Sequence, residues 1–126
     1  MRRMRSERGA VAVEFALVLP LLVAMLLGIM EFGLMYNGQV SVTNAARETA
    51  RTMVVTNDPA AARNAARAAT PGLNPGLTNA EIRITPATCT PGATARITIS
   101  HPFGSITKFF GPGVTLTGRA AMRCGG

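Results

Sequence analysis

The sequence predicts an α+β protein with a long N-terminal helix, a second short helix and a three-stranded antiparallel sheet. Three patterns in the 126 residues predict this fold class. A charge-free apolar run extends from Phe15 to Met30, an amphipathic helical pattern follows it, and from residue 81 onward apolar residues recur at every second position. The first two patterns are typical of helices, and the third is typical of strands that have one covered face.

The apolar run is long enough to span a membrane. At about 1.5 Å per residue, a helix over residues 10–36 measures roughly 40 Å, which crosses the hydrocarbon core of a bilayer with some tilt. We therefore divide the chain into a basic leader at residues 1–9, a transmembrane helix at 10–36 and an extracytoplasmic α+β domain at 37–126. An ordinary secretory signal peptide is the alternative for the first 36 residues, but the apolar part is long for an h-region and no small-x-small site closes it.

The charges around the span predict its orientation. Four arginines precede it, at Arg2, Arg3, Arg5 and Arg8. Basic flanks stay in the cytoplasm, so we expect a single-pass protein of the inner (cytoplasmic) membrane whose C-terminal domain is periplasmic or extracellular.

The helix is expected to continue beyond the span. From Asn37 to Val55 one face is made of small or apolar residues at helical spacing. The residues of that face are Val42, Ala45, Ala46, Thr49 and Met53. Asp58 is a good N-cap and Pro59 suits the first position of a second, alanine-rich helix, which ends at Thr70 before a Pro/Gly loop.

Three strands are predicted at residues 81–85, 94–100 and 114–123. The side chains of the covered face are Ile82 and Ile84, then Ala95, Ile97 and Ile99, then Val114, Leu116, Gly118, Ala120 and Met122. We expect the outer half of the long helix and the short helix to cover this face. The linker from His101 to Pro112, which contains Phe103, Phe109 and Phe110, is expected to form a short helix, and His101 is interpreted as a structural loop residue.

The two cysteines follow the span, at Cys89 and Cys124. Cys89 lies in the predicted turn between the first two strands. In an up-and-down meander the third strand runs parallel to the first, so its end at Cys124 returns to the edge that carries this turn. In an oxidising space an even number of cysteines favours a disulfide, worth about 2–4 kcal/mol. The alternative is two unpaired, buried thiols.

The composition points away from catalysis. There is one histidine, no glycine-rich phosphate loop and no spacing of metal ligands, so we expect neither an enzyme nor a cofactor or metal site. The net charge is +7, but without residues 1–9 nine basic and five acidic side chains remain. Without a run of basic residues or interleaved aromatics, we do not expect nucleic-acid binding.

Glu14 lies in the first turns of the predicted span, where a carboxylate is costly. One interpretation is that it snorkels to the headgroups of a generic anchor. However, the basic leader, Gly9 and then the string AVAVEF resemble the processing site of type IVb pilins and pseudopilins. The longer string RGAVAVEFALVLPLL, with NAARETAR after the span, is similar to the TadE-like pseudopilins of tight-adherence (Flp) pilus systems.

The resemblance implies a pilin-like fold and a specific role. A prepilin peptidase would cut between Gly9 and Ala10, and Glu14, then fifth in the mature chain, would serve assembly. The chain would be a minor pilin or pseudopilin for surface adhesion, with other pilins, Tad pilus assembly proteins and the inner membrane as partners. The main alternative is an unprocessed, single-span membrane protein that presents a periplasmic binding domain. A weaker alternative is a pilus tip that binds DNA or a surface through its arginines. The role of Glu31, near the outer end of the span, is left open.

Overall fold

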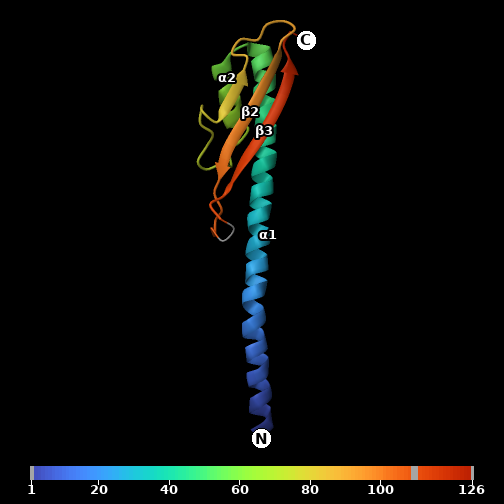
Figure 1. The fold of residues 1–126 in the computed structure, drawn as a ribbon, viewed down its shortest axis with the longest axis vertical. Helices are drawn as coiled ribbons and strands as arrows, with labels where there is room; N and C mark the ends of the chain where they lie inside the picture. The colour runs from blue at the N-terminus through green and yellow to red at the C-terminus, as the bar shows by residue number, and fades with distance from the viewer. Residues whose placement is uncertain (1, 109–110, 126) are drawn as a thin grey trace. The chain divides into compact units, whose positions relative to one another are not determined.

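The computed structural model describes residues 2–108 and 111–125, and the side chains of 7–108 and 111–125. In these residues the chain forms helices α1 (Arg2–Thr56) and α2 (Pro59–Ala68) and strands β1 (Ile82–Thr85), β2 (Thr94–Phe103) and β3 (Val114–Arg123) (Figure 1). The chain divides into two compact units, Met1–Leu34 and Met35–Gly126. This confirms the predicted α+β fold class, with a long helix, a short helix and a three-stranded antiparallel sheet.

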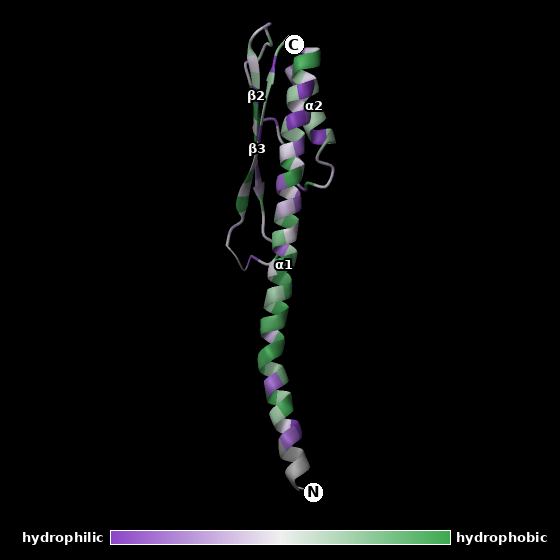
Figure 2. Cartoon of the chain, turned by 90° about the vertical axis from the view of Figure 1, so that its right-hand side faces the viewer, coloured by the Kyte–Doolittle hydropathy of each residue, from purple (hydrophilic) through white to green (hydrophobic). Residues whose placement is uncertain are grey.

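The first unit consists of the N-terminal part of α1. Among the described residues, one helix is long and apolar enough to cross a membrane, and it is this one. Its most apolar stretch is not covered by any other part of the structure. Figure 2 shows the hydrophobic colouring that follows this part of the helix. The helix therefore fits a single-pass membrane anchor.

The second unit contains a sheet in the order β1-β2-β3, with both pairs antiparallel. Ile82 and Ile84 lie opposite Ile99 and Ile97, and Gly118 and Ala120 lie opposite the same two residues from the other side. All four isoleucines are buried. Because side chains alternate between the two faces of a strand, the apolar residues of the three strands lie on the same face of the sheet.

Helix residues cover this face of the sheet. The buried core combines the C-terminal part of α1 with two alanines of α2 and the inner residues of the three strands. The α1 contribution is Val42, Ala45, Ala46, Ala50 and Met53, and the α2 contribution is Ala62 and Ala66. The unit thus has two layers, with helices on one side and the sheet on the other (Figure 2). The predicted N-cap of α2 is also present, since Asp58 accepts a hydrogen bond from the Ala60 N–H at 2.9 Å.

Two glycines let the layers approach closely. A Cβ atom built at Gly118 of β3 would lie 2.5 Å from the backbone oxygen of Val42 on α1. A Cβ atom at Gly38 of α1 would lie 2.8 Å from the Leu116 Cδ1 atom of β3. Glycine destabilises the interior of a helix, but a larger residue at position 38 would clash with β3.

We expect Gly118→Ala to lower the free energy of unfolding by about 1–3 kcal/mol, because the new methyl group meets a helix backbone that must move. Gly72→Ala is the matched control, because a Cβ atom there has no neighbour within 4 Å. Its effect should stay within about 0.5 kcal/mol. Thermal unfolding of the full-length variants in detergent micelles, followed by circular dichroism, measures both. Equal stability of Gly118→Ala and wild type would contradict the close packing of α1 on β3.

Three details differ from the sequence prediction. Val114 and Met122 have the expected parity but are 54% and 38% exposed, because the helices cover only the middle of β3. Strand β2 continues to Phe103, so His101 is a strand residue and not a loop residue. The predicted short helix is wrong for residues 104–108 and 111–113, which have no helical structure, while Phe109 and Phe110 lie outside the described residues.

Candidate functional site

The predicted processing residues lie on α1, in the N-terminal unit. Gly9, Ala10 and Glu14 are all exposed, and a Cβ atom at Gly9 would have no neighbour within 4 Å. Since helical positions i and i+4 share a face, the backbone nitrogen of Ala10 lies one turn below the Glu14 carboxylate along the same side of α1. The structure therefore brings Ala10 and Glu14 onto one helix face and leaves the Gly9–Ala10 bond accessible.

The surface around Glu14 is apolar and uncovered. Val11, Val13, Phe15 and Leu17 are between 60% and 73% exposed. Burying such side chains is worth about 1.5–3 kcal/mol each, so this segment requires lipid or neighbouring helices. Glu31 is half-buried on the same helix. The Glu14 carboxylate thus lies on a helix face that is otherwise apolar. A cationic partner would lower the free-energy cost of placing this charge in an apolar environment.

The structure also brings the two cysteines together. Cys89 and Cys124 form a disulfide with 5.7 Å between their Cα atoms, and Cys124 is buried. The backbone around the bridge is held as well, because the Cys124 N–H donates to the Ala93 carbonyl at 2.8 Å. The Cys89 N–H donates to the Asn57 side-chain oxygen at 2.6 Å. The bridge therefore ties the end of β3 to the β1–β2 turn, beside the C-terminal end of α1.

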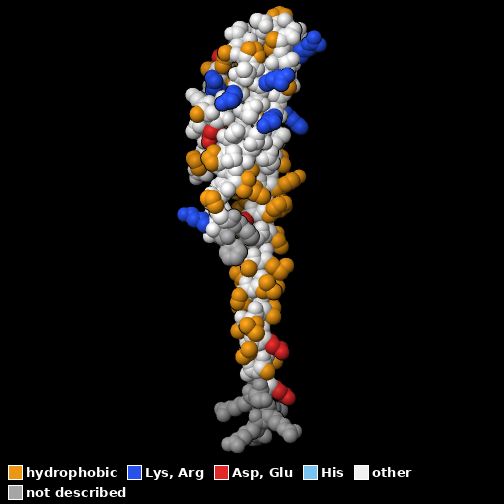
Figure 3. Space-filling model, viewed as in Figure 1, with side chains coloured by type: hydrophobic (Ala, Val, Ile, Leu, Met, Phe, Trp, Pro, Cys, Tyr) orange, Lys and Arg blue, Asp and Glu red, His pale blue; other side chains and the backbone are white. Residues whose placement is uncertain are grey.

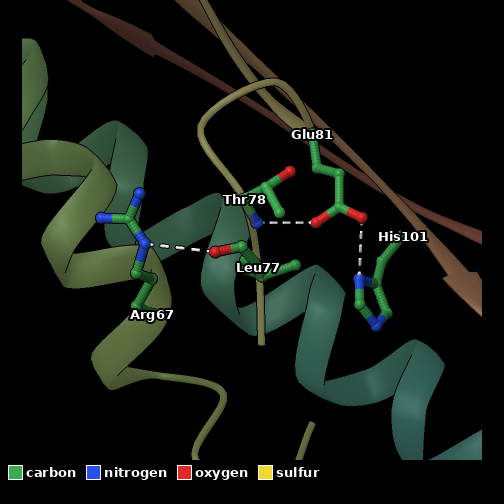
Figure 4. A network of polar contacts seen from close by, with 5 residues as sticks. All are labelled: Arg67, Leu77, Thr78, Glu81 and His101. Carbon is green, nitrogen blue, oxygen red and sulfur yellow. Dashed lines mark hydrogen bonds and ion pairs between the residues drawn. The ribbon is translucent and has the colours of Figure 1, made fainter. Parts of the chain in front are cut away.

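A polar pair that was not predicted from the sequence joins a buried strand residue, His101, to the partly buried Glu81. His101 is only 2% exposed, and its Nδ1 atom lies 3.2 Å from the Glu81 Oε1 atom (Figure 4). The other carboxylate oxygen of Glu81 accepts a hydrogen bond from the Thr78 N–H at 2.7 Å. The alternation of strand residues could have predicted this position. His101 is two residues beyond Ile99, so both side chains point to the covered face of the sheet.

The segment before β1 is anchored to α2 as well. Arg67 donates from Nε to the Leu77 carbonyl at 3.2 Å (Figure 4). Its guanidinium also contacts the side chains of Asn64 and Asn79. Leu77 itself is buried in the core. Arg67 and Glu81 thus hold two adjacent residues, Leu77 and Thr78, of the connection between α2 and β1, and their role is structural.

The pKa of Glu81 is lowered. Partial burial of the carboxyl works in the opposite direction, but the hydrogen bond from Thr78 and the hydrogen bond and charge of His101 outweigh it. A carboxyl whose pKa is lower in the folded chain stabilises the fold at pH values above its unfolded-state pKa. This stabilisation is lost as the pH falls through the folded-state pKa.

We therefore expect Glu81→Gln to lower the free energy of unfolding at neutral pH by about 1–2 kcal/mol, since two hydrogen bonds lose their charged acceptor. The difference from wild type should shrink as the pH falls through the lowered pKa of Glu81, where the wild-type carboxyl also takes up a proton. Thermal unfolding at several pH values measures this. Glu48→Gln, at an exposed carboxylate of α1, is the control. A difference for Glu81→Gln that is constant with pH would show that the charge of Glu81 is not responsible.

The described residues offer little to a metal ion. Within residues 2–108 and 111–125 there is no group of three or more His, Cys, Asp and Glu side chains that could hold one. The features that remain as a candidate functional site are the exposed apolar helix, the Gly9–Ala10 bond and the Glu14 carboxylate.

Comparison with known proteins gives one match. The family model for TadE-like protein matches residues 9–51, which is about a third of the chain and includes Gly9, Ala10 and Glu14. No curated protein and no solved structure matches the chain. The similarity inferred from the sequence is thus confirmed for α1, and it associates the chain with Tad pilus systems. The match does not extend to α2, the sheet or the cysteines.

Proposed function

We propose that this chain, which is TadE-like over residues 9–51, is a minor pilin or pseudopilin that takes part in assembling a tight-adherence (Flp, type IVb) pilus. The observation that carries the proposal is the combination of Gly9, Ala10 and Glu14 at the start of an exposed apolar helix. The role is structural and not enzymatic. The pilus would serve surface adhesion.

Processing is the first step of this proposal. A prepilin peptidase at the cytoplasmic face of the inner membrane cuts the Gly9–Ala10 bond and leaves the apolar helix in place. The exposure of this bond supports accessibility, and the absence of a side chain at Gly9 lets an extended leader enter a narrow cleft. The new α-amino group belongs to Ala10, one helical turn from Glu14.

Assembly is the second step. In lipid the Glu14 carboxylate is costly unless a positive group accompanies it. In a bundle of subunits, the amine of a neighbouring mature chain pairs with Glu14 and sets the axial register between the two helices. The exposed apolar side chains around Glu14 supply the contact area for these neighbouring helices.

The C-terminal domain lies on the periplasmic side in this proposal. The basic residues before the span support this orientation. The Cys89–Cys124 disulfide supports it too, because such bridges persist in oxidising compartments and are rare in the cytosol.

Affinity purification from the organism's own membranes tests the proposal. The full chain, with a tag at its C-terminus, is solubilised in a mild detergent, and the co-purifying proteins are identified by mass spectrometry. We expect other pilins and pilus assembly proteins. Recovery of the chain with its leader intact, and with no pilus protein, would instead support the alternative of an unprocessed, single-span periplasmic binding protein.

A further inference from the structure

The outer face of the sheet carries an array of arginines. Arg83 of β1 and Arg119 of β3 both lie beside Thr98 of the central strand, one on each side. Arg96 lies two residues from Thr98 on β2, and Arg123 lies opposite Thr94. With strands about 4.8 Å apart and about 3.4 Å per residue, the Cα atom of Arg96 is roughly 8 Å from those of the other three arginines. One arginine thus occupies the middle of the array.

These arginines have no partner within the described part of the chain. All four are exposed, and none of their guanidinium groups forms a hydrogen bond or an ion pair with another described residue. The outward strand positions between and beside them are Thr85, Thr94, Thr98, Ser100, Thr117 and Ala121, without an acidic or aromatic side chain. Glu81, just before β1, is already bonded to Thr78 and His101. Figure 3 shows the basic side chains spread over the face of the domain on which β2 and β3 lie.

Without a bound partner, such an array destabilises the folded domain. Like charges that lie close on one face of a sheet repel each other, and solvent-exposed sheet faces are stable with mixed charges. The domain from Met35 to Gly126 has nine basic and three acidic side chains, so its charge of +6 adds to this repulsion. An anionic partner would relieve it. The choice of arginine matters too, because its planar guanidinium binds a carboxylate through two parallel hydrogen bonds.

We propose that this face, defined by Arg83, Arg96, Arg119 and Arg123 and called the arginine face, binds an acidic polysaccharide. The carboxylates on successive sugars pair with the guanidinium groups, and the threonine hydroxyls between them bond to sugar hydroxyls. The exposed outer face of a three-stranded sheet suits an extended chain that lies across the strands. The described residues of this face include no aromatic side chain on which a base could stack, which disfavours a nucleic acid. The inference does not depend on the proposed role in pilus assembly.

The test uses the full-length chain in neutral detergent micelles and oligogalacturonate as the probe. Isothermal titration calorimetry gives the affinity at two salt concentrations. The double variant Arg96→Gln/Arg119→Gln should weaken binding roughly tenfold or more, because it removes two charge-assisted contacts from the array. The control variant Arg47→Gln/Arg51→Gln removes the same charge from exposed positions of α1 and should change the affinity less than about twofold. Circular dichroism checks that both variants fold.

Further probes separate the arginine face from general electrostatic attraction. The methyl-esterified oligomer has the same backbone without the charges, and its binding should be at least tenfold weaker. Equal loss of affinity in both double variants would overturn the proposal, because net charge would then explain binding. Absence of oligogalacturonate binding would also overturn it. Tighter binding of a DNA duplex, with the same dependence on Arg96 and Arg119, would replace it by a nucleic-acid surface.

Discussion

Replacing Gly9 with leucine should leave the chain uncut when it is co-expressed with a prepilin peptidase. The reason is steric, because a bulky side chain directly before the scissile bond cannot follow an extended glycine into the peptidase cleft. The substitution should not disturb the helix itself, since a Cβ atom at position 9 has no neighbour within 4 Å and leucine is a better helix former than glycine. Electrophoretic mobility before and after co-expression measures the loss of processing.

Gly33→Leu is the matched control for this experiment. Gly33 lies on the same helix, and a Cβ atom there also has no neighbour within 4 Å. The Gly33→Leu chain should be cut as completely as wild type. If Gly9→Leu is processed normally, or if the wild type is not shortened by the peptidase, the proposed cleavage site is wrong.

Glu14→Ala and Glu14→Gln should each reduce co-purification of partner pilins several-fold and reduce the number of pili on the cell. Both substitutions remove the negative charge that the proposal pairs with the α-amino group of a neighbouring chain. Membrane insertion should be unchanged, because removing a carboxylate from an apolar helix favours insertion. The Cys89–Cys124 bridge and the fold of the C-terminal domain should be unchanged as well.

Three controls make the result for Glu14 specific. Expression is matched, cleavage of each variant is checked separately, and Glu48→Gln removes a carboxylate from an exposed position of α1 that lies beyond the proposed span. Equal recovery of pilins and normal pili with a processed Glu14→Ala chain would reduce Glu14 to a snorkelling side chain. The generic membrane-anchor interpretation would then be favoured.

Much of the fold could be predicted from residue patterns because those patterns report burial. Ile82, Ile84, Ile97 and Ile99 alternate with polar residues, and all four lie in the core. The same rule was misleading at the ends of β3. Val114 keeps the correct parity, yet it is exposed because the helical layer does not reach it. Alternation shows which way a side chain points, but it does not show how far the covering element extends.

The end of β2 shows another limit. The predicted strand at residues 94–100 ends two residues before Pro102, and proline gives no hydrogen bond to a sheet ladder. In the structure β1 starts at Ile82, opposite Ile99, so Pro102 lies beyond the start of β1 and its only neighbouring strand is β3. Proline is tolerated at such an edge. Because this extension of β2 was not predicted, His101 was not assigned to the covered face of the sheet. Its contact with Glu81, 20 positions away in the sequence, was therefore not expected.

The proposed functional residues could be recognised in the sequence for a different reason. Gly9, Ala10 and Glu14 lie within six positions of each other on one helix, so their mutual arrangement follows from helix geometry. The arginine face could not be recognised in the same way. Its members come from three strands, and only the register of the sheet brings Arg83, Arg96 and Arg119 together.

The intact mass of the chain isolated from its own membranes tests the central claim most directly. The account predicts a mature chain that begins at Ala10 and retains the whole apolar helix. Sequencing of the N-terminus identifies the first residue independently of any modification. A mass that corresponds to a chain beginning at Met1 would contradict processing, and one that begins beyond residue 36 would show that the helix is a removed signal peptide and not part of a pilin.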